Sequence, residues 1–192
     1  MKRRTWMTMA APALVGLLAT AAHAQIITHG STTMNMDFVT VGNPGNPGDT
    51  TGDPNPCGSV GYAYRIGKYE VTADQWAAVI AADPNVGNAG YWTGSQPTGG
   101  ASWHEAAKFC NWLTSGSANS GYYTIDINGY ATPNALSHAD FAALYGTTYF
   151  TPTEDEWYKA AYYNGSAGIY YNYPTASDNV PDGIDFRRRH LI

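Results

Sequence analysis

The chain has few basic residues. Of its 192 residues, 10 are lysine or arginine and 15 are aspartate or glutamate. Three of the bases fall at positions 2–4 and three at 187–189. The body of the chain therefore holds four: Arg65, Lys68, Lys108 and Lys159. So sparse a set excludes the basic patch with which proteins contact nucleic-acid phosphates, and it does not suit anionic membrane surfaces.

Cysteine is also scarce, since only Cys57 and Cys110 are present. In an oxidising compartment these two thiols could form a disulfide, but sequence spacing does not reveal whether the geometry permits one. Cys110 falls on an apolar helical stripe with Phe109 and Leu113, a pattern typical of a buried small hydrophobe. The histidines show no zinc-ligand spacing. The sequence therefore predicts no metal site.

Long apolar runs are missing except at the N-terminus. There the basic residues 2–4 precede an apolar stretch over 7–19 that Pro12 interrupts and that is too short to span a bilayer. The small residues Ala22 and Ala24 flank His23 and precede Gln25, a layout typical of a secretory signal peptide; a twin-arginine route and a buried helix are the alternatives. We expect cleavage after Ala24, a secreted or periplasmic product, and no membrane span in it.

Removing residues 1–24 would take away three bases and no acids, so the formal charge would change from −5 to −8. The remaining length suits one domain with a sizeable core. Glycine (21 residues) and tyrosine (15) are abundant, whereas charged residues make up only 13% of the chain. This mixture favours a loop-rich domain in which aromatic side chains provide much of the buried area.

Three segments carry the hydroxyl-x-x-Glu/Gln pattern of a helix capping box, starting at Thr72, Ser102 and Thr153. For the third, Thr151 followed by Pro152 is an equally good start. The first helix should end before Asp83 and the second near residues 114–116. Each start precedes apolar residues at helical spacing. In the third helix these are Trp157, Ala160 and Ala161, which we expect to face inward.

Alternation predicts strands within 26–41 and 62–70, with a short strand at 122–127 and a short helix at 137–144. Residues 43–56 are too rich in proline and glycine to form a β-strand, so we expect turns and loops there. We expect an α+β fold with a few short amphipathic helices, short strands and long loops. The expected divisions are a signal peptide (1–24), an N-terminal strand and loop (25–58), a main domain (59–186) and a basic tail (187–192).

Three of these segments together resemble the formylglycine-generating enzyme, or sulfatase-modifying factor, family. They are residues 66–76, residues 102–112 and residues 151–161, and the last is the most specific. The matching motif residues are Gly67, Tyr69, Glu70, Val71, Thr72, Ser102, Trp103, Cys110, Trp112, Pro152, Thr153, Glu154, Glu156 and Trp157. The resemblance covers roughly residues 60–175 and implies a C-type-lectin-like fold.

The chain departs from the family pattern in three places. Thr151 stands where leucine is usual, and about 25 residues are inserted within 119–149. No segment after Tyr173 matches the later motifs, which in the family provide calcium ligands and a pair of active-site cysteines. We therefore expect a domain that is incomplete at its C-terminus, through a shifted or shortened reading frame, with an evolved basic tail as the alternative.

The resemblance implies an oxidase that converts a substrate cysteine to formylglycine with O2 and copper(I) held by two thiolates. Because this chain lacks the pair, we expect no copper or calcium in it and a non-catalytic role with an unknown protein or glycan partner. A carbohydrate- or surface-polymer-binding module and a working oxidase are the alternatives. Candidate ligand contacts are Tyr170, Tyr171 and Tyr173.

The other groups of polar residues that could suggest catalysis are better explained by structural roles. Carboxylates at Glu154, Asp155 and Glu156 would stabilise a helix N-terminus, and Ser102 would serve as an N-cap even though His104 is nearby. On this interpretation the domain must bury Trp76, Trp103, Trp112 and Trp157, and any apolar surface left uncovered would favour aggregation.

Overall fold

A three-stranded antiparallel sheet forms the base of the molecule in the computed structural model, which describes residues 23–51, 55–88 and 90–181. Its strands are β1 (His23–His29), β2 (Thr32–Val41) and β3 (Tyr64–Gly67), in that order. The β1–β2 turn uses Gly30 at a φ of 58°, a left-handed conformation that glycine adopts without steric cost. The predicted strands in 26–41 and 62–70 are confirmed, and β3 is shorter than expected.

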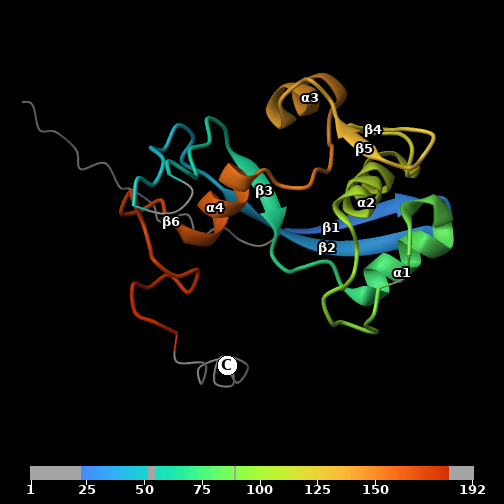
Figure 1. Cartoon of the computed structure of the whole chain (residues 1–192), viewed down its shortest axis with the longest axis horizontal. Coiled ribbons are helices and arrows are strands. Elements are labelled where there is room, and N and C mark those ends of the chain that lie inside the picture. Colours follow the sequence, from blue (N-terminus) through green and yellow to red (C-terminus); the bar gives the residue numbers. More distant parts are fainter. Residues whose placement is uncertain (1–22, 52–54, 89, 182–192) are drawn as a thin grey trace, which may run out of the picture.

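Two helices cover one face of this sheet (Figure 1). They are α1 (Ala73–Ala82) and α2 (Trp103–Ser115), and a short 3-10 helix, η1 (Pro84–Val86), follows α1. Both begin with the predicted capping box, and α2 ends at Gly116 in a left-handed conformation. The predicted starts and ends of these helices are confirmed.

The main core lies between the helices and the sheet. Ile27, Met34 and Met36 from the strands meet Trp76 of α1 and Trp112 of α2. The Trp76 ring stacks on Phe109, with centroids 5.0 Å apart and planes inclined by 9°. Because these residues are nearly inaccessible to water, their burial supplies much of the free energy of folding.

A second core cluster packs on the other side of α2. It belongs to the segment inserted between the second and third motifs, with β4 (Tyr123–Ile125), β5 (Ala131–Pro133) and α3 (His138–Tyr145). The predicted strand and helix are confirmed, whereas β5 was not predicted; it ends at Pro133, a residue that is unfavourable within a ladder. The fully buried Asn111 ties this segment to α2 through hydrogen bonds to Ala118 O (3.0 Å) and Tyr123 O (2.8 Å).

The last described part comprises α4 (Glu154–Tyr162), β6 (Tyr163–Asn164) and β7 (Ile169–Tyr170). It packs against the loop that connects β2 to β3, where Asp49 and Cys57 form an isolated bridge. Lys159 donates from Nζ to the carbonyl of Asn43 at 2.9 Å. The β6–β7 hairpin was not predicted because no periodic pattern marks it.

The expectation that α4 faces inward with Trp157 is wrong. Trp157 is 51% exposed and Ala160 and Ala161 are only half-buried, whereas the charged Glu156 and Lys159 are buried. The expectation for Trp103 is also wrong, since 46% of it is exposed. The two exposures have different causes. The loop that α4 meets presents the carbonyl of Asn43 and the N–H of Gly58 rather than apolar side chains. Trp103 makes edge contacts with His104 and Tyr123 but belongs to neither core cluster.

Candidate functional site

A groove with a volume of about 1010 Å³ lies within the described part of the chain. It is lined by residues 62–71, by parts of α2 and α3, and by the segment 146–152 that leads into α4. Figure 1 shows the chain that crosses from α3 to α4, with α2 on one side of it and β3 on the other. Since aromatic and aliphatic side chains dominate the lining, the groove suits an apolar or mixed ligand surface.

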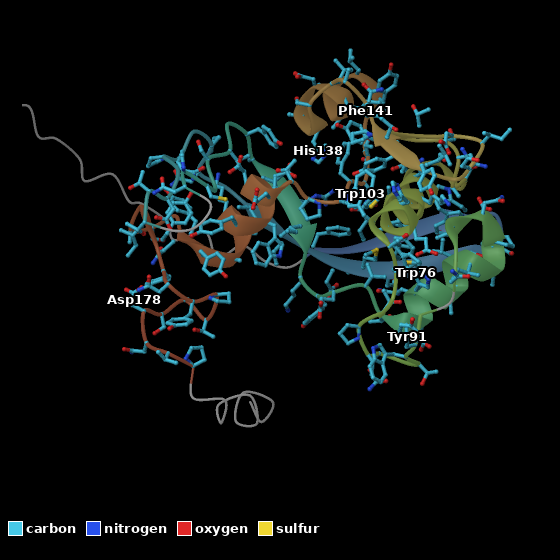
Figure 2. The ribbon with its side chains drawn as sticks, viewed as in Figure 1. Trp76, Tyr91, Trp103, His138, Phe141 and Asp178 are labelled. Carbon is cyan, nitrogen blue, oxygen red and sulfur yellow. The ribbon has the colours of Figure 1, made fainter. Side chains whose placement is uncertain are left out.

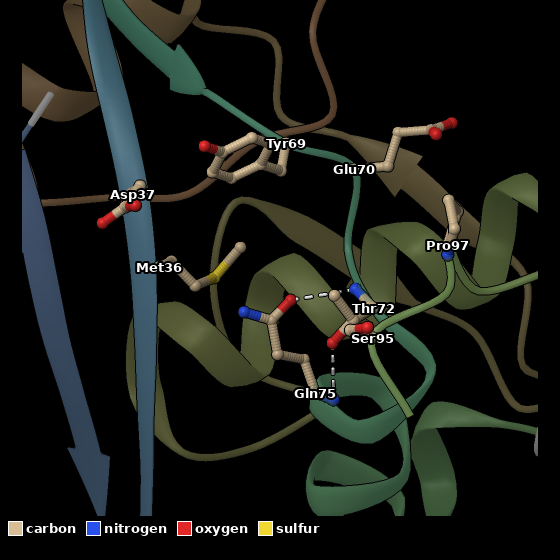
Figure 3. Close-up of a pocket in the computed structure, with 8 residues that line it drawn as sticks. All are labelled: Met36, Asp37, Tyr69, Glu70, Thr72, Gln75, Ser95 and Pro97. Carbon is tan, nitrogen blue, oxygen red and sulfur yellow. Dashed lines mark hydrogen bonds between the residues drawn. The ribbon is translucent and has the colours of Figure 1, made fainter. Parts of the chain in front are cut away.

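A smaller pocket of about 340 Å³ lies beside the groove at the N-terminus of α1. Figure 3 shows the Thr72–Gln75 capping box inside it, with Thr72 N–H donating to Gln75 Oε1 at 2.9 Å and Gln75 N–H donating to Thr72 Oγ1 at 3.2 Å. The motif residues Tyr69 and Glu70 line both cavities and are exposed. The first family motif thus forms the border between the pocket and the groove.

The most concentrated polar chemistry of the groove surrounds the buried carboxylate of Glu156. Tyr62 donates its hydroxyl to Oε1 at 2.7 Å, and Thr153 N–H donates to Oε2 at 2.7 Å. His138 Nδ1 lies 3.0 Å from Oε2. The Tyr64 hydroxyl bonds the backbone carbonyl of Glu156. The carboxylate therefore has partners from α3, from the residues before β3 and from the N-cap of its own helix.

Electrostatics around Glu156 follow from this geometry. Burial alone would raise the pKa of its carboxyl group, but the hydrogen bonds from His138, Thr153 and Tyr62 outweigh burial and hold the pKa below its ordinary value. Burial and the bond to Glu156 raise the pKa of Tyr62. Such a carboxylate is ionised and fully bonded at neutral pH, so it positions α3 against α4 rather than acting as a base.

Sequence reasoning missed the partnership of His138 with Glu156. The two residues are 18 positions apart and come from different helices, so no local spacing links them. The His138 ring also stacks on Phe150, with centroids 4.1 Å apart. Figure 2 shows His138 and Phe141, both residues of α3, on the upper side of the molecule. The only sequence signal was that His138 follows a good N-cap, Ser137.

The motif residues have different structural roles. Ser102 and Thr153 are N-caps in complete capping boxes, and Trp112 is buried. Pro152, Glu156 and Trp157 reach the groove together with Gly67 and Val71, whereas Trp103 and Glu154 are exposed and are not among its lining. His104 is not a base for Ser102, because its Nδ1 accepts a hydrogen bond from Ala131 N–H at 3.0 Å.

The two cysteines are free thiols in separate surroundings. Cys110 belongs to the second core cluster, and burial raises its pKa to about 12. Cys57 is buried against the first turn of α4, where burial and the neighbouring Asp155 carboxylate raise its pKa. Copper(I) needs thiolates that share one site. The thiols of this chain do not fit that requirement, since both hold their protons and they occupy different parts of the molecule.

Tyr170, Tyr171 and Tyr173 each make a contact within the fold. The Tyr170 hydroxyl accepts from Asn46 Nδ2 at 2.6 Å and donates to Gly58 O at 2.7 Å. A Cβ at Gly58 would lie 2.7 Å from that hydroxyl, so the contact requires glycine. Tyr171 bonds Asn164, and Tyr173 forms an isolated backbone bridge to Ser177. Tyr170 therefore anchors β7 to the β2–β3 loop.

The described residues include no group of three or more histidine, cysteine or acidic side chains arranged to hold a metal ion. None of their helices is long and apolar enough to cross a bilayer. Together, the small sheet, the capped helices and the long connecting loops define a mixed α+β domain of the C-type-lectin-like class.

The family follows from comparison with known proteins. Residues 18–185 match the model of the sulfatase-modifying factor enzyme 1-like domain, so the chain belongs to this family. Among solved structures, Treponema denticola variable protein 1 aligns with 26% identity and a TM-score of 0.42 over 72% of this chain and 56% of that one. The present chain thus spans little more than half the length of that protein. Among curated proteins, none matches.

Proposed function

We propose that this chain is a non-catalytic member of the sulfatase-modifying factor family, exported from the cell, which binds a partner through its groove. The observation that carries the proposal is the state of its two thiols. Cys57 and Cys110 are free, buried and apart, and each has a raised pKa. Oxidation of a cysteine through copper(I) needs paired thiolates, and these thiols cannot pair without unfolding the core.

The test is an oxidation assay with the full 192-residue chain. The chain is mixed with copper(I), O2 and a cysteine-containing peptide, and mass spectrometry follows conversion of the cysteine to the aldehyde. We expect no conversion, while a catalytically active family member converts the peptide under the same conditions. Formation of formylglycine that disappears in the Cys110→Ser variant would overturn the proposal.

Export is supported by the N-terminal residues and by the position of the predicted cut. Cleavage after Ala24 would remove two residues of β1 and keep the ladder from the Gln25–Met36 pair onward. We expect the protein recovered outside the cytoplasm to begin at Gln25, as N-terminal sequencing would show. An Ala22→Arg variant should accumulate uncleaved, because a large charged residue does not fit the cleavage pattern. Wild-type protein that keeps Met1 would count against export.

A glycan ligand is the second candidate, and exposed aromatic rings on one loop favour it. Tyr91 is 83% exposed and Trp92 is 55% exposed. Their rings lie directly on glycine backbone: a Cβ at Gly100 would come within 2.3 Å of Tyr91, and one at Gly99 within 2.7 Å of Trp92. Figure 2 shows Tyr91 well away from Trp103 and His138, so this loop is a surface of its own.

A glycan array distinguishes this candidate from a protein partner. If sugars bind, Tyr91→Ala and Trp92→Ala should each abolish the signal, since an exposed ring offers its face for stacking. Tyr170→Phe is the matched control, because the Tyr170 hydroxyl is used inside the fold. Binding that is lost in the control and kept in the loop variants would exclude the loop as the site.

A further inference from the structure

The strand β3 is an open edge of the sheet, and this edge borders the groove. The order β1–β2–β3 places β3 on the outside, and all residues from 62 to 71 line the groove. Within the described part of the chain, no other strand pairs with β3 on its outer side. An uncovered edge presents backbone donors and acceptors in a row, which is the surface that an added strand recognises.

The register shows which backbone groups are free to pair. Lys68 N–H donates to Asp37 O at 2.8 Å, and the ladder pairs Gly67 with Phe38 and Arg65 with Thr40. Hydrogen-bonded pairs alternate with non-bonded ones in an antiparallel ladder. The N–H and C=O groups of Arg65 and Gly67 therefore point away from β2, toward the outer edge.

Apolar side chains surround this edge. Phe38, Tyr149 and Phe150 line the groove, as does Trp157, which is 51% exposed. A tryptophan ring half open to water beside a strand edge leaves apolar area that an added strand would cover. The groove therefore offers both backbone pairing and pockets for alternate side chains.

The basic side chains of the groove indicate that a bound segment would carry negative charge. Arg65 and Lys68, two of the four bases in the body of the chain, line the groove beside one exposed acid, Glu70. The other acid of the lining, Glu156, is buried and already bonded within the fold. Neither base forms an ion pair with a described residue; Arg65 lies 5.8 Å from the Phe38 ring centroid and Lys68 lies 5.0 Å from that of Tyr69. A second copy would bring the same bases to the same seam, which like-charge repulsion disfavours. An acidic strand would meet them favourably.

We propose that the β3 edge binds an extended, acidic polypeptide segment of another protein, which joins the sheet as a fourth strand within the groove. This inference rests on the proposed function, because it names the kind of partner that a non-catalytic domain would bind there. Backbone pairing at Arg65 and Gly67 provides affinity, the aromatic wall accepts alternate apolar side chains, and Arg65 and Lys68 select for acidic residues.

The test uses the full chain and an end-blocked peptide of about ten residues in which valine and glutamate alternate. Hydrogen exchange should show new protection at the amides of Arg65 and Gly67 and little change at Tyr64 and Ile66, which already pair with β2. A peptide N-methylated at alternate positions cannot donate to the edge and should bind at least about tenfold more weakly. A valine–lysine peptide should bind more weakly than the acidic one.

Variants separate backbone pairing from charge. Arg65→Pro removes an outward N–H and a charge, whereas Arg65→Gln removes the charge alone, so the proline variant should bind more weakly than the glutamine variant. Lys68→Glu should weaken acidic-peptide binding by about threefold to tenfold and favour the lysine peptide. Lys108→Glu makes the same charge change on α2, outside the groove, and should leave binding unchanged. Circular dichroism checks that each variant is folded.

Three results would overturn the strand-addition proposal: no added protection at Arg65 and Gly67, equal binding of the N-methylated peptide, or dimerisation through β3 in place of peptide binding. None of them bears on the thiols. Conversely, oxidation of a cysteine peptide would overturn the non-catalytic function and leave strand addition standing. The two failures are therefore distinguishable.

Discussion

The helices α2 and α4 start in the same way and bury opposite kinds of residue. Each has a complete capping box, formed by Ser102 with Glu105 and by Thr153 with Glu156. From there α2 buries apolar residues such as Phe109 and Trp112, whereas α4 buries Glu156 and Lys159. The start of a helix is thus a local property, and the identity of its buried face is not.

The surroundings of the two helices explain the difference. α2 lies between two clusters of apolar side chains, so its buried face must be apolar. α4 instead meets the β2–β3 loop, which offers the carbonyl of Asn43 to Lys159 and the N–H of Gly58 to the Asp155 carboxylate at 2.6 Å. Buried backbone groups need partners, and charged side chains of α4 supply them.

The largest expected effect compares a tryptophan from each helix. Trp112 is 1% exposed, so Trp112→Ala should lower the free energy of unfolding by about 3–5 kcal/mol through a core cavity. Trp157→Ala, at a half-exposed ring, should cost less than about 1 kcal/mol. Urea unfolding followed by circular dichroism measures both. Equal losses would show that the groove side of α4 is packed as tightly as α2.

Removing the Glu156 carboxylate should have the next largest effect. Glu156→Ala leaves His138 and Tyr62 without their buried partner and should cost about 3 kcal/mol of unfolding free energy. Glu154→Ala, an exposed acid in the same helical turn, is the control and should cost about 0.5 kcal/mol through the helix dipole. A similar small loss for both variants would contradict a structural role for the Glu156 cluster.

The same carboxylate predicts how stability changes with acid. The folded-state pKa of Glu156 lies below its ordinary value of 4.5, so its contribution is present above that value and is lost as the pH falls through the folded pKa. Urea midpoints measured from pH 6 to pH 3 should fall less steeply in Glu156→Gln than in the wild type. Some slope should remain, because Glu105 and Asp83 also have lowered pKa values. Identical slopes would argue against the Glu156 contribution.

The smallest effects concern the shared helix starts. Ser102→Ala and Thr153→Ala should each cost about 1 kcal/mol, since each removes the acceptor for one helix N–H. Ser102→Thr and Thr153→Ser keep a hydroxyl and should be nearly neutral. A loss confined to Ser102→Ala would mean that α4 relies on the Glu156 cluster and not on its cap.

Much of the local structure was predictable from particular residues. Thr72, Ser102 and Thr153 marked three helix starts because a hydroxyl and a Glu or Gln three positions later satisfy backbone groups within one turn. Met34 and Met36 indicated the buried face of β2 because strand side chains alternate. The β6–β7 hairpin was not predictable, since its closest partners are the distant Asn46 and Gly58, bonded through Tyr170.

The sequence by itself determined the family and the positions of the capped helices and main strands, because these depend on residues within a few positions of one another. Only the tertiary structure decided which side chains are buried at the site. His138 meets Glu156, and Trp157 remains in the groove, because residues far apart in the chain decide what each helix face contacts. Burial and hydrogen bonding depend on those neighbours, and a linear pattern does not contain them.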